Sequence, residues 1–179
     1  MSKFLVIAEK PSVAQSYAKN LSAYKREDGY LEGESCIVSW CLGHLAEYAQ
    51  PEEYDPKYEK WQFDDLPILP EAWKLKVSKD KKKQFEVIKT LMNRSDVEYL
   101  VNGCDAGREG ELIFQRMYVL AGCRKPVKRL WISSMEDAAI QKGFQTMKSE
   151  EEYKNLCMAA VCRAQADWLI GMNGTSSST

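Results

Sequence analysis

The chain has 179 residues, a formal net charge of −1 at pH 7 and 45% hydrophobic residues, which suits one α/β domain with a sizeable core. It shows neither a charged-then-apolar leader nor an apolar run of membrane-spanning length, so we expect a cytoplasmic protein without membrane attachment. The near-neutral charge argues against a domain that holds nucleic acid by itself through a broad basic surface.

Apolar runs and helical spacings alternate along the chain. Strands are predicted at 3–9, 35–40, 73–77, 97–102 and 127–132, with 73–77 at an edge and a hairpin-like stretch around Gly29 and Gly33. Helices are predicted at 11–21, 80–93, 109–121 and 135–147, the last capped by Ser133 or Ser134, and helical spacing resumes from 151 to 168. Residues 46–72 hold four of the six prolines and favour a long ordered excursion. The alternation predicts a parallel sheet with helices on both faces.

Acidic residues follow two of these strands at the point where each strand ends. Glu9 comes directly after a buried apolar run, Asp105 follows strand 97–102, and Glu109 begins the next helix. Because parallel strands end at a common edge, where open α/β sheets bind ligands, we expect the three carboxylates to converge. Clustered carboxylates need a cation or a proton, and Mg²⁺ favours carboxylates plus waters and phosphates. Attraction to the helix dipole is the competing explanation, and for Glu111 alone it is equally good.

Cysteine and lysine patterns carry less information. The six cysteines include no C-x-x-C pair, so we expect them to be reduced and mostly buried, without structural zinc. The basic run 79–83 is typical of a solvated helix face, with phosphate steering along a DNA groove as the alternative.

Two motifs resemble the Toprim domain of type IA DNA topoisomerases: Glu9-Lys10-Pro11-Ser12 and the segment from Asp105 to Glu111, Asp-Ala-Gly-Arg-Glu-Gly-Glu. Gly43-His44-Leu45 and the segment 163–173 are similar to the topoisomerase III branch of that family. The resemblance covers almost the whole chain and implies a Rossmann-like Toprim sheet of about four parallel strands flanked by helices. One position departs from the common Asp-x-Asp-x-Glu pattern, because Gly107 replaces the middle aspartate and removes one candidate metal ligand.

The resemblance also implies roles for individual residues. Glu9 would donate a proton to the leaving 3′ oxygen, and Lys10 would stabilise charge on the scissile phosphate. Metal binding would rest on Glu9, Asp105 and Glu109 as Mg²⁺ ligands. DNA contacts are implied for four residues: Arg108, His44, Arg163 and Asp167. From the residues alone, His44 is equally explained as a packed histidine, and the Arg163–Asp167 spacing by a helix salt bridge.

The resemblance implies a domain organisation as well. Residues 1–150 would form the Toprim domain, 151–173 the start of the next, helical topoisomerase domain, and 174–179 a polar tail. Family members cut DNA with a tyrosine in a separate downstream domain, and none of the nine tyrosines here lies in that context. We therefore expect an N-terminal fragment, inactive alone, of an enzyme that cleaves, passes and religates single-stranded DNA together with its remaining domains.

A second hypothesis is an autonomous Mg²⁺-dependent Toprim nuclease, in which a metal-bound water replaces the tyrosine. The missing middle aspartate argues against it. A flavodoxin-like or nucleotide-binding domain is disfavoured, because no P-loop or G-x-G-x-x-G follows the first strand.

Overall fold

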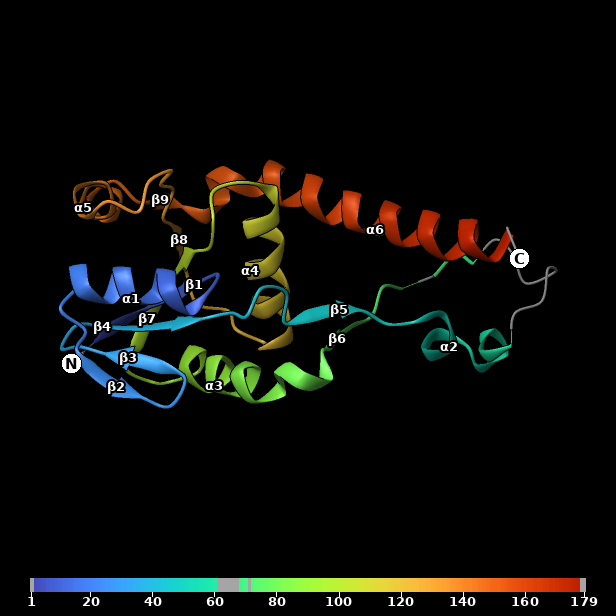
Figure 1. Ribbon diagram of the computed structural model, residues 1–179, viewed down its shortest axis with the longest axis horizontal. Coiled ribbons are helices and arrows are strands. Elements are labelled where there is room, and N and C mark those ends of the chain that lie inside the picture. Colours follow the sequence, from blue (N-terminus) through green and yellow to red (C-terminus); the bar gives the residue numbers. More distant parts are fainter. Residues whose placement is uncertain (1, 61–67, 71, 178–179) are drawn as a thin grey trace.

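The computed structural model describes residues 2–60, 68–70 and 72–177. Its centre is a seven-stranded sheet in the order β2-β3-β4-β1-β7-β8-β9 (Figure 1). The strands of this sheet are β1 (Lys3–Ala8), β2 (Lys25–Glu27), β3 (Tyr30–Glu32), β4 (Cys36–Trp40), β7 (Val97–Gly103), β8 (Val127–Arg129) and β9 (Lys148–Ser149). A separate antiparallel pair is formed by β5 (Ala46–Tyr48) and β6 (Leu75–Val77).

Six α-helices and three short 3-10 helices are described within these ranges. The α-helices are α1 (Pro11–Asn20), α2 (Pro51–Tyr54), α3 (Lys82–Met92), α4 (Arg108–Leu120), α5 (Asp137–Gln145) and α6 (Lys154–Ser177). The 3-10 helices are Pro56–Glu59, Lys79–Lys81 and Glu150–Tyr153.

The middle of the sheet is parallel, as the alternating pattern predicted. Strands β4, β1, β7 and β8 run parallel, whereas β3 and β2 at one edge and β9 at the other are antiparallel. The hairpin-like stretch corresponds to β2 and β3. The α/β class and the four parallel strands are therefore confirmed.

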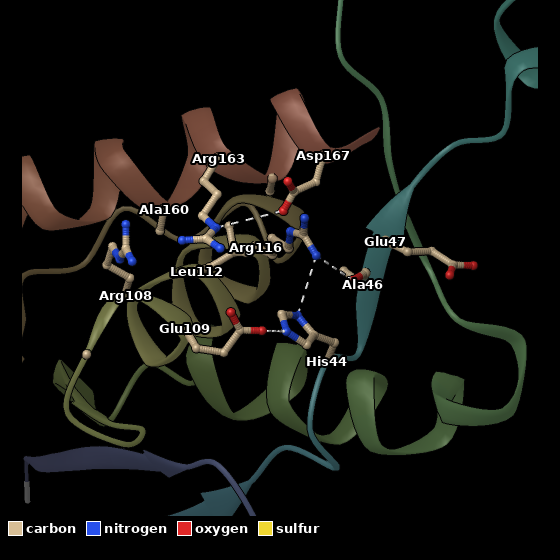
Figure 2. Close-up of a pocket in the computed structure, with 12 residues that line it drawn as sticks. His44, Ala46, Glu47, Arg108, Glu109, Leu112, Arg116, Ala160, Arg163 and Asp167 are labelled. Carbon is tan, nitrogen blue, oxygen red and sulfur yellow. Dashed lines mark hydrogen bonds and ion pairs between the residues drawn. The ribbon is translucent and has the colours of Figure 1, made fainter. Parts of the chain in front are cut away.

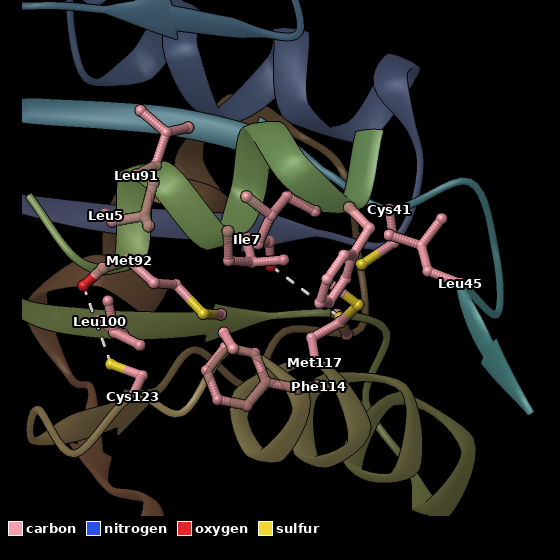
Figure 3. Close-up of a cluster of buried hydrophobic side chains, with 14 of the residues drawn as sticks. Leu5, Ile7, Cys41, Leu45, Leu91, Met92, Leu100, Phe114, Met117 and Cys123 are labelled. Carbon is pink, nitrogen blue, oxygen red and sulfur yellow. Dashed lines mark hydrogen bonds between the residues drawn. The ribbon is translucent and has the colours of Figure 1, made fainter. Parts of the chain in front are cut away.

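Every residue of β1 after Lys3 is apolar, because both faces of the sheet are covered at this strand. Leu5 and Ile7 face a core formed with α3 and α4 (Figure 3), while Val6 and Ala8 face a core that includes α1 and α5. All four side chains are completely buried. Alternating residues of a central strand thus serve two separate cores.

Several predicted boundaries differ from the observed ones. Strand β8 ends at Arg129 instead of 132, because its partner β7 turns into a loop after Gly103. The strand predicted at 73–77 is β6, which pairs with β5 and not with the central sheet. The cap prediction for α5 is wrong: Glu136 is at the N-cap, and Ser134 accepts a hydrogen bond from the Glu136 N–H instead (3.3 Å).

The excursion at 46–72 contains β5, α2 and a 3-10 helix in its described part, while 61–67 and 71 lie outside the described residues. The helical spacing predicted at 151–168 corresponds to a 3-10 helix followed by α6. Helix α6 continues to Ser177, so the start of the expected polar tail is helical.

Helix α6 lies along one side of the molecule and packs on α4 (Figure 1). Its Trp168 is buried against Tyr48 and Ile68 and donates a hydrogen bond from Nε1 to the Ala49 carbonyl (3.2 Å). Among the described residues, none of the helices combines the length and the apolar character needed to cross a membrane.

The six cysteines are free thiols, as expected. Four are buried in the cores or beside them: Cys36, Cys41, Cys104 and Cys123.

Candidate functional site

The parallel sheet brings Glu9 and Asp105 together across a hundred residues of sequence. Ala8 and Gly103 are paired neighbours in β1 and β7, so the loops after both strands begin at the same edge. The Asp105 N–H donates a hydrogen bond to Glu9 Oε1 (3.3 Å). Burial and the nearby Asp105 carboxylate raise the pKa of Glu9, with a smaller contribution from Glu109. The predicted convergence is therefore observed for these two acids.

Arg129 lies beneath the loop that carries Asp105. Its side chain is completely buried, and its Nε lies 2.6 Å from Glu111 Oε1, which is also completely buried. The guanidinium donates hydrogen bonds to four backbone carbonyls: Asn102 (3.1 Å), Cys104 (2.6 Å), Asp105 (2.8 Å) and Leu130 (3.2 Å). The bonds to Cys104 and Asp105 satisfy carbonyls beyond the end of β7 and thereby fix the loop.

Sequence reasoning missed Arg129 and the partner of Glu111. The available signal was the place of Arg129 on the buried face of a short alternating strand. A charge on such a face needs a partner. Glu111 was recognised only as an acid of a helix first turn. The structure shows that it neutralises Arg129 inside the protein.

Two glycines allow the loop to approach the helix. Gly107, at the N-cap of α4, has φ +136°, a conformation that side chains rarely adopt. An aspartate at 107 would strain this loop conformation. At Gly110, an added Cβ would lie 2.0 Å from the Asp105 carbonyl oxygen, so only glycine permits this close approach.

A cavity of about 760 Å³ opens beside this edge, between α4, α6 and the segment around His44 (Figure 2). Its lining includes all four predicted DNA-contacting residues together with Glu109: His44, Arg108, Arg163 and Asp167. Arg163 Nε lies 4.0 Å from Asp167 Oδ2 at i,i+4 spacing, as the helix alternative predicted. Within the described parts of the chain, Arg108 has no ion-pair partner. Its guanidinium is therefore available to an anion.

The third predicted metal ligand has a different partner. The Glu109 carboxylate contacts Nε2 of His44, which lies 65 residues away in sequence. Over the described parts of the chain, no group of three or more His, Cys, Asp or Glu side chains is arranged to hold a metal ion. Glu9 and Asp105 supply the carboxylate oxygens that Mg²⁺ prefers, and Mg²⁺ commonly takes one or two carboxylates plus waters and phosphates. Two of the three predicted ligands, Glu9 and Asp105, therefore fit Mg²⁺.

Lys10 and Arg116 complete the surroundings. Lys10 is exposed at the N-cap position of α1. Arg116, which sequence reasoning missed, is 8% exposed and donates a hydrogen bond from Nη1 to the Ala46 carbonyl (3.1 Å), 3.4 Å from His44 Nδ1. Lys81 of the basic run donates to the His44 carbonyl (2.8 Å). Arg116 and Lys81 therefore hold the His44 segment against α4 and α3.

Comparison with known proteins identifies the family of the chain. Residues 4–135 match the family described as "Toprim domain". All 179 residues align with proteins named DNA topoisomerase 3, at 50% identity in Bacillus subtilis (strain 168) and 48% in Bacillus licheniformis, covering 25% of each. The full-length topoisomerase I structure from Thermotoga maritima superposes with a TM-score of 0.61 at 18% identity, over 93% of this chain and 24% of that chain. The chain thus spans about a quarter of the length of these relatives.

The close approach at Gly110 can be tested against a second helical glycine. Gly110→Ala should lower the free energy of unfolding by about 1–3 kcal/mol, because the new methyl group meets the Asp105 carbonyl. Gly171→Ala on α6 is the matched control: its Cβ would meet nothing within 4 Å, so the free energy of unfolding should rise by about 0.5–1 kcal/mol. Urea denaturation of both variants measures the difference. Equal effects of the two substitutions would contradict the assigned contact.

Proposed function

The chain belongs to the Toprim family, and from this premise we propose that it is the metal-binding and DNA-positioning part of a type IA topoisomerase of the topoisomerase III branch. The observation that carries the proposal is the meeting of Glu9 and Asp105 at the sheet edge, beside an arginine-lined cavity. In a longer protein that supplies the nucleophilic tyrosine, the site would take part in cleavage, strand passage and religation of single-stranded DNA. Alone, the chain would be inactive, because the nucleophilic tyrosine lies in another part of the longer protein.

Glu9 and Lys10 are the proposed catalytic residues. A general acid must hold its proton until the leaving oxygen needs it, and burial together with Asp105 raises the pKa of Glu9 in the required direction. Lys10 follows directly at the same edge, where its ammonium would stabilise charge that develops on the phosphate. Its exposure leaves it free to reach a substrate.

Mg²⁺ is the proposed cofactor, held by Glu9, Asp105 and Glu109. When bound, the ion supplies positive charge that offsets the repulsion between the carboxylates and attracts a phosphate group. Glu9 and Asp105 already lie in contact. Glu109 would join them only after giving up its contact with His44.

The cavity between α4 and α6 is the proposed path of the DNA strand. Arg108 begins α4 and Arg163 lies on α6, so phosphates could be bound from both walls. His44 and Asp167 would position the strand between them. We place the protein in the cytoplasm, associated with the nucleoid, with Toprim residues 1–150, a helical segment 151–173 that begins the next domain, and a tail at 174–179.

The autonomous nuclease remains the second candidate. Hydrolysis by two metals needs more carboxylates than the pair that meets here, and Gly107 supplies none. The metal-binding and DNA-positioning part of a topoisomerase is therefore the better-supported function.

Glu9→Gln should abolish DNA cleavage in the longer protein that includes the tyrosine-bearing region, because glutamine has no acidic proton to give to the leaving oxygen. Cleavage of a single-stranded oligonucleotide, trapped with a denaturant as the covalent complex, measures this. Glu34→Gln is the matched control, since Glu34 is exposed in the turn before β4 at the opposite end of the strands. Near-normal cleavage by the Glu9 variant would remove the assigned role.

In the longer protein, Arg108→Gln and Arg163→Gln should each weaken binding to single-stranded DNA. If each arginine neutralises one phosphate, each substitution lowers the slope of log K against log salt by about 0.7. Fluorescence anisotropy of a labelled oligonucleotide across a salt series gives this slope. The control is Arg124→Gln, an exposed arginine outside the cavity, which should leave the slope unchanged. A slope that changes equally in all three variants would mean that the cavity does not bind the strand.

A further inference from the structure

A second group of acidic side chains is buried away from the sheet edge, where α6 begins. Glu150 opens the 3-10 helix that precedes α6 and is partly buried. Its carboxyl group lies within hydrogen-bonding reach of Glu111 on α4 and accepts a hydrogen bond from Asn102 Nδ2 on β7 (3.3 Å). Two acids from distant parts of the chain therefore share one interior site with Arg129.

The charges at this site do not balance if both acids are ionised. Arg129 forms an ion pair with Glu111. Among the described residues, no lysine or arginine forms an ion pair with Glu150. The two nearest lysines in sequence, Lys148 and Lys154, are both exposed.

Unpartnered oxygens point to the same conclusion. Within the described residues, Oε2 of Glu111 and Oε2 of Glu150 are buried without a hydrogen-bond donor, and Oε1 of Glu111 has only the Arg129 Nε contact. Buried acceptors without donors are costly. One proton on Glu150 removes the repulsion between the carboxyl groups and supplies the missing donor to Glu111.

We propose that Glu150 is a proton-dependent latch, which in its protonated form holds the beginning of α6 against α4 and the sheet. The latch acts on the cavity because Ala160, Arg163 and Asp167, which line it, follow on the same helix. Opening the latch frees the first turns of α6, while Trp168 still anchors the rest of the helix. The inference concerns the attachment of α6 and stands whether or not the chain acts on DNA.

The direction of the pH dependence follows from the pKa of Glu150 in the closed latch and in the released form. Burial, followed by Glu111, raises the pKa of Glu150 from 4.5 to about 8, against the opposing effects of Asn102 and Arg129. A released Glu150 in water returns to its ordinary pKa, so release becomes more favourable as pH rises from about 5 to about 8 and levels off above that. The neighbouring thiol of Cys157 on α6 has a pKa raised to about 11 by burial and the two glutamates, so it stays neutral over this range.

Amide hydrogen exchange of the chain measures the latch directly. In the unmodified protein, protection factors of the amides from 153 to 160 should fall by about 50-fold between pH 6 and pH 8, because the released Glu150 is ionised over this range while the closed form is half-ionised at pH 8. The Glu150→Gln variant keeps a hydrogen-bond donor and has no proton to lose, so its protection factors should stay constant. Glu152→Gln is the matched control, because Glu152 is exposed in the same 3-10 helix and should leave the fall unchanged.

An equal fall in the unmodified protein and in the Glu150→Gln variant would overturn the proposal. A second measurement decides the matter if that variant does not fold. The side-chain carboxyl ¹³C signal of Glu150, assigned in the unmodified protein, should titrate above pH 7, whereas titration near pH 4.5 would rule the latch out.

Discussion

Arg129 donates hydrogen bonds to backbone carbonyls at the ends of β7 and β8 and lies in a buried ion pair with Glu111 of α4. Through these bonds one side chain ties two strands, one helix and the Asp105 loop together. Loss of one member of a buried ion pair leaves an uncompensated charge and typically costs about 3–5 kcal/mol. The position of Asp105, and hence its contact with Glu9, depends on this single guanidinium.

The same buried arginine links the sheet edge to α6. Glu111 is its partner, and Glu150 at the start of α6 lies against Glu111. Helix α6 in turn forms one wall of the cavity, while α4 forms the facing wall and begins next to Asp105. The acids at the sheet edge, the cavity and the attachment of α6 are thus parts of one connected network of charges.

What could be predicted from the sequence was the part fixed by strand topology. Glu9 and Asp105 follow apolar strands, and parallel strands end at one edge, so their meeting needed no knowledge of side-chain packing. The contact of Glu109 with His44 was not predictable, because it joins the first turn of α4 to a loop residue 65 positions away, and no periodic signal relates the two. The partners of Arg129 were missed for a related reason: they include backbone carbonyls at the end of another strand, which no pattern within β8 reveals.

The most direct test of the metal site at the sheet edge is paramagnetic NMR of the chain with Mn²⁺, which takes the same oxygen ligands as Mg²⁺. The account predicts the strongest broadening of amide signals at Glu9, Lys10 and Asp105, reversed by excess Mg²⁺. Broadening centred instead on exposed acids elsewhere, such as Glu52 and Glu151, with the sheet edge unaffected, would contradict it.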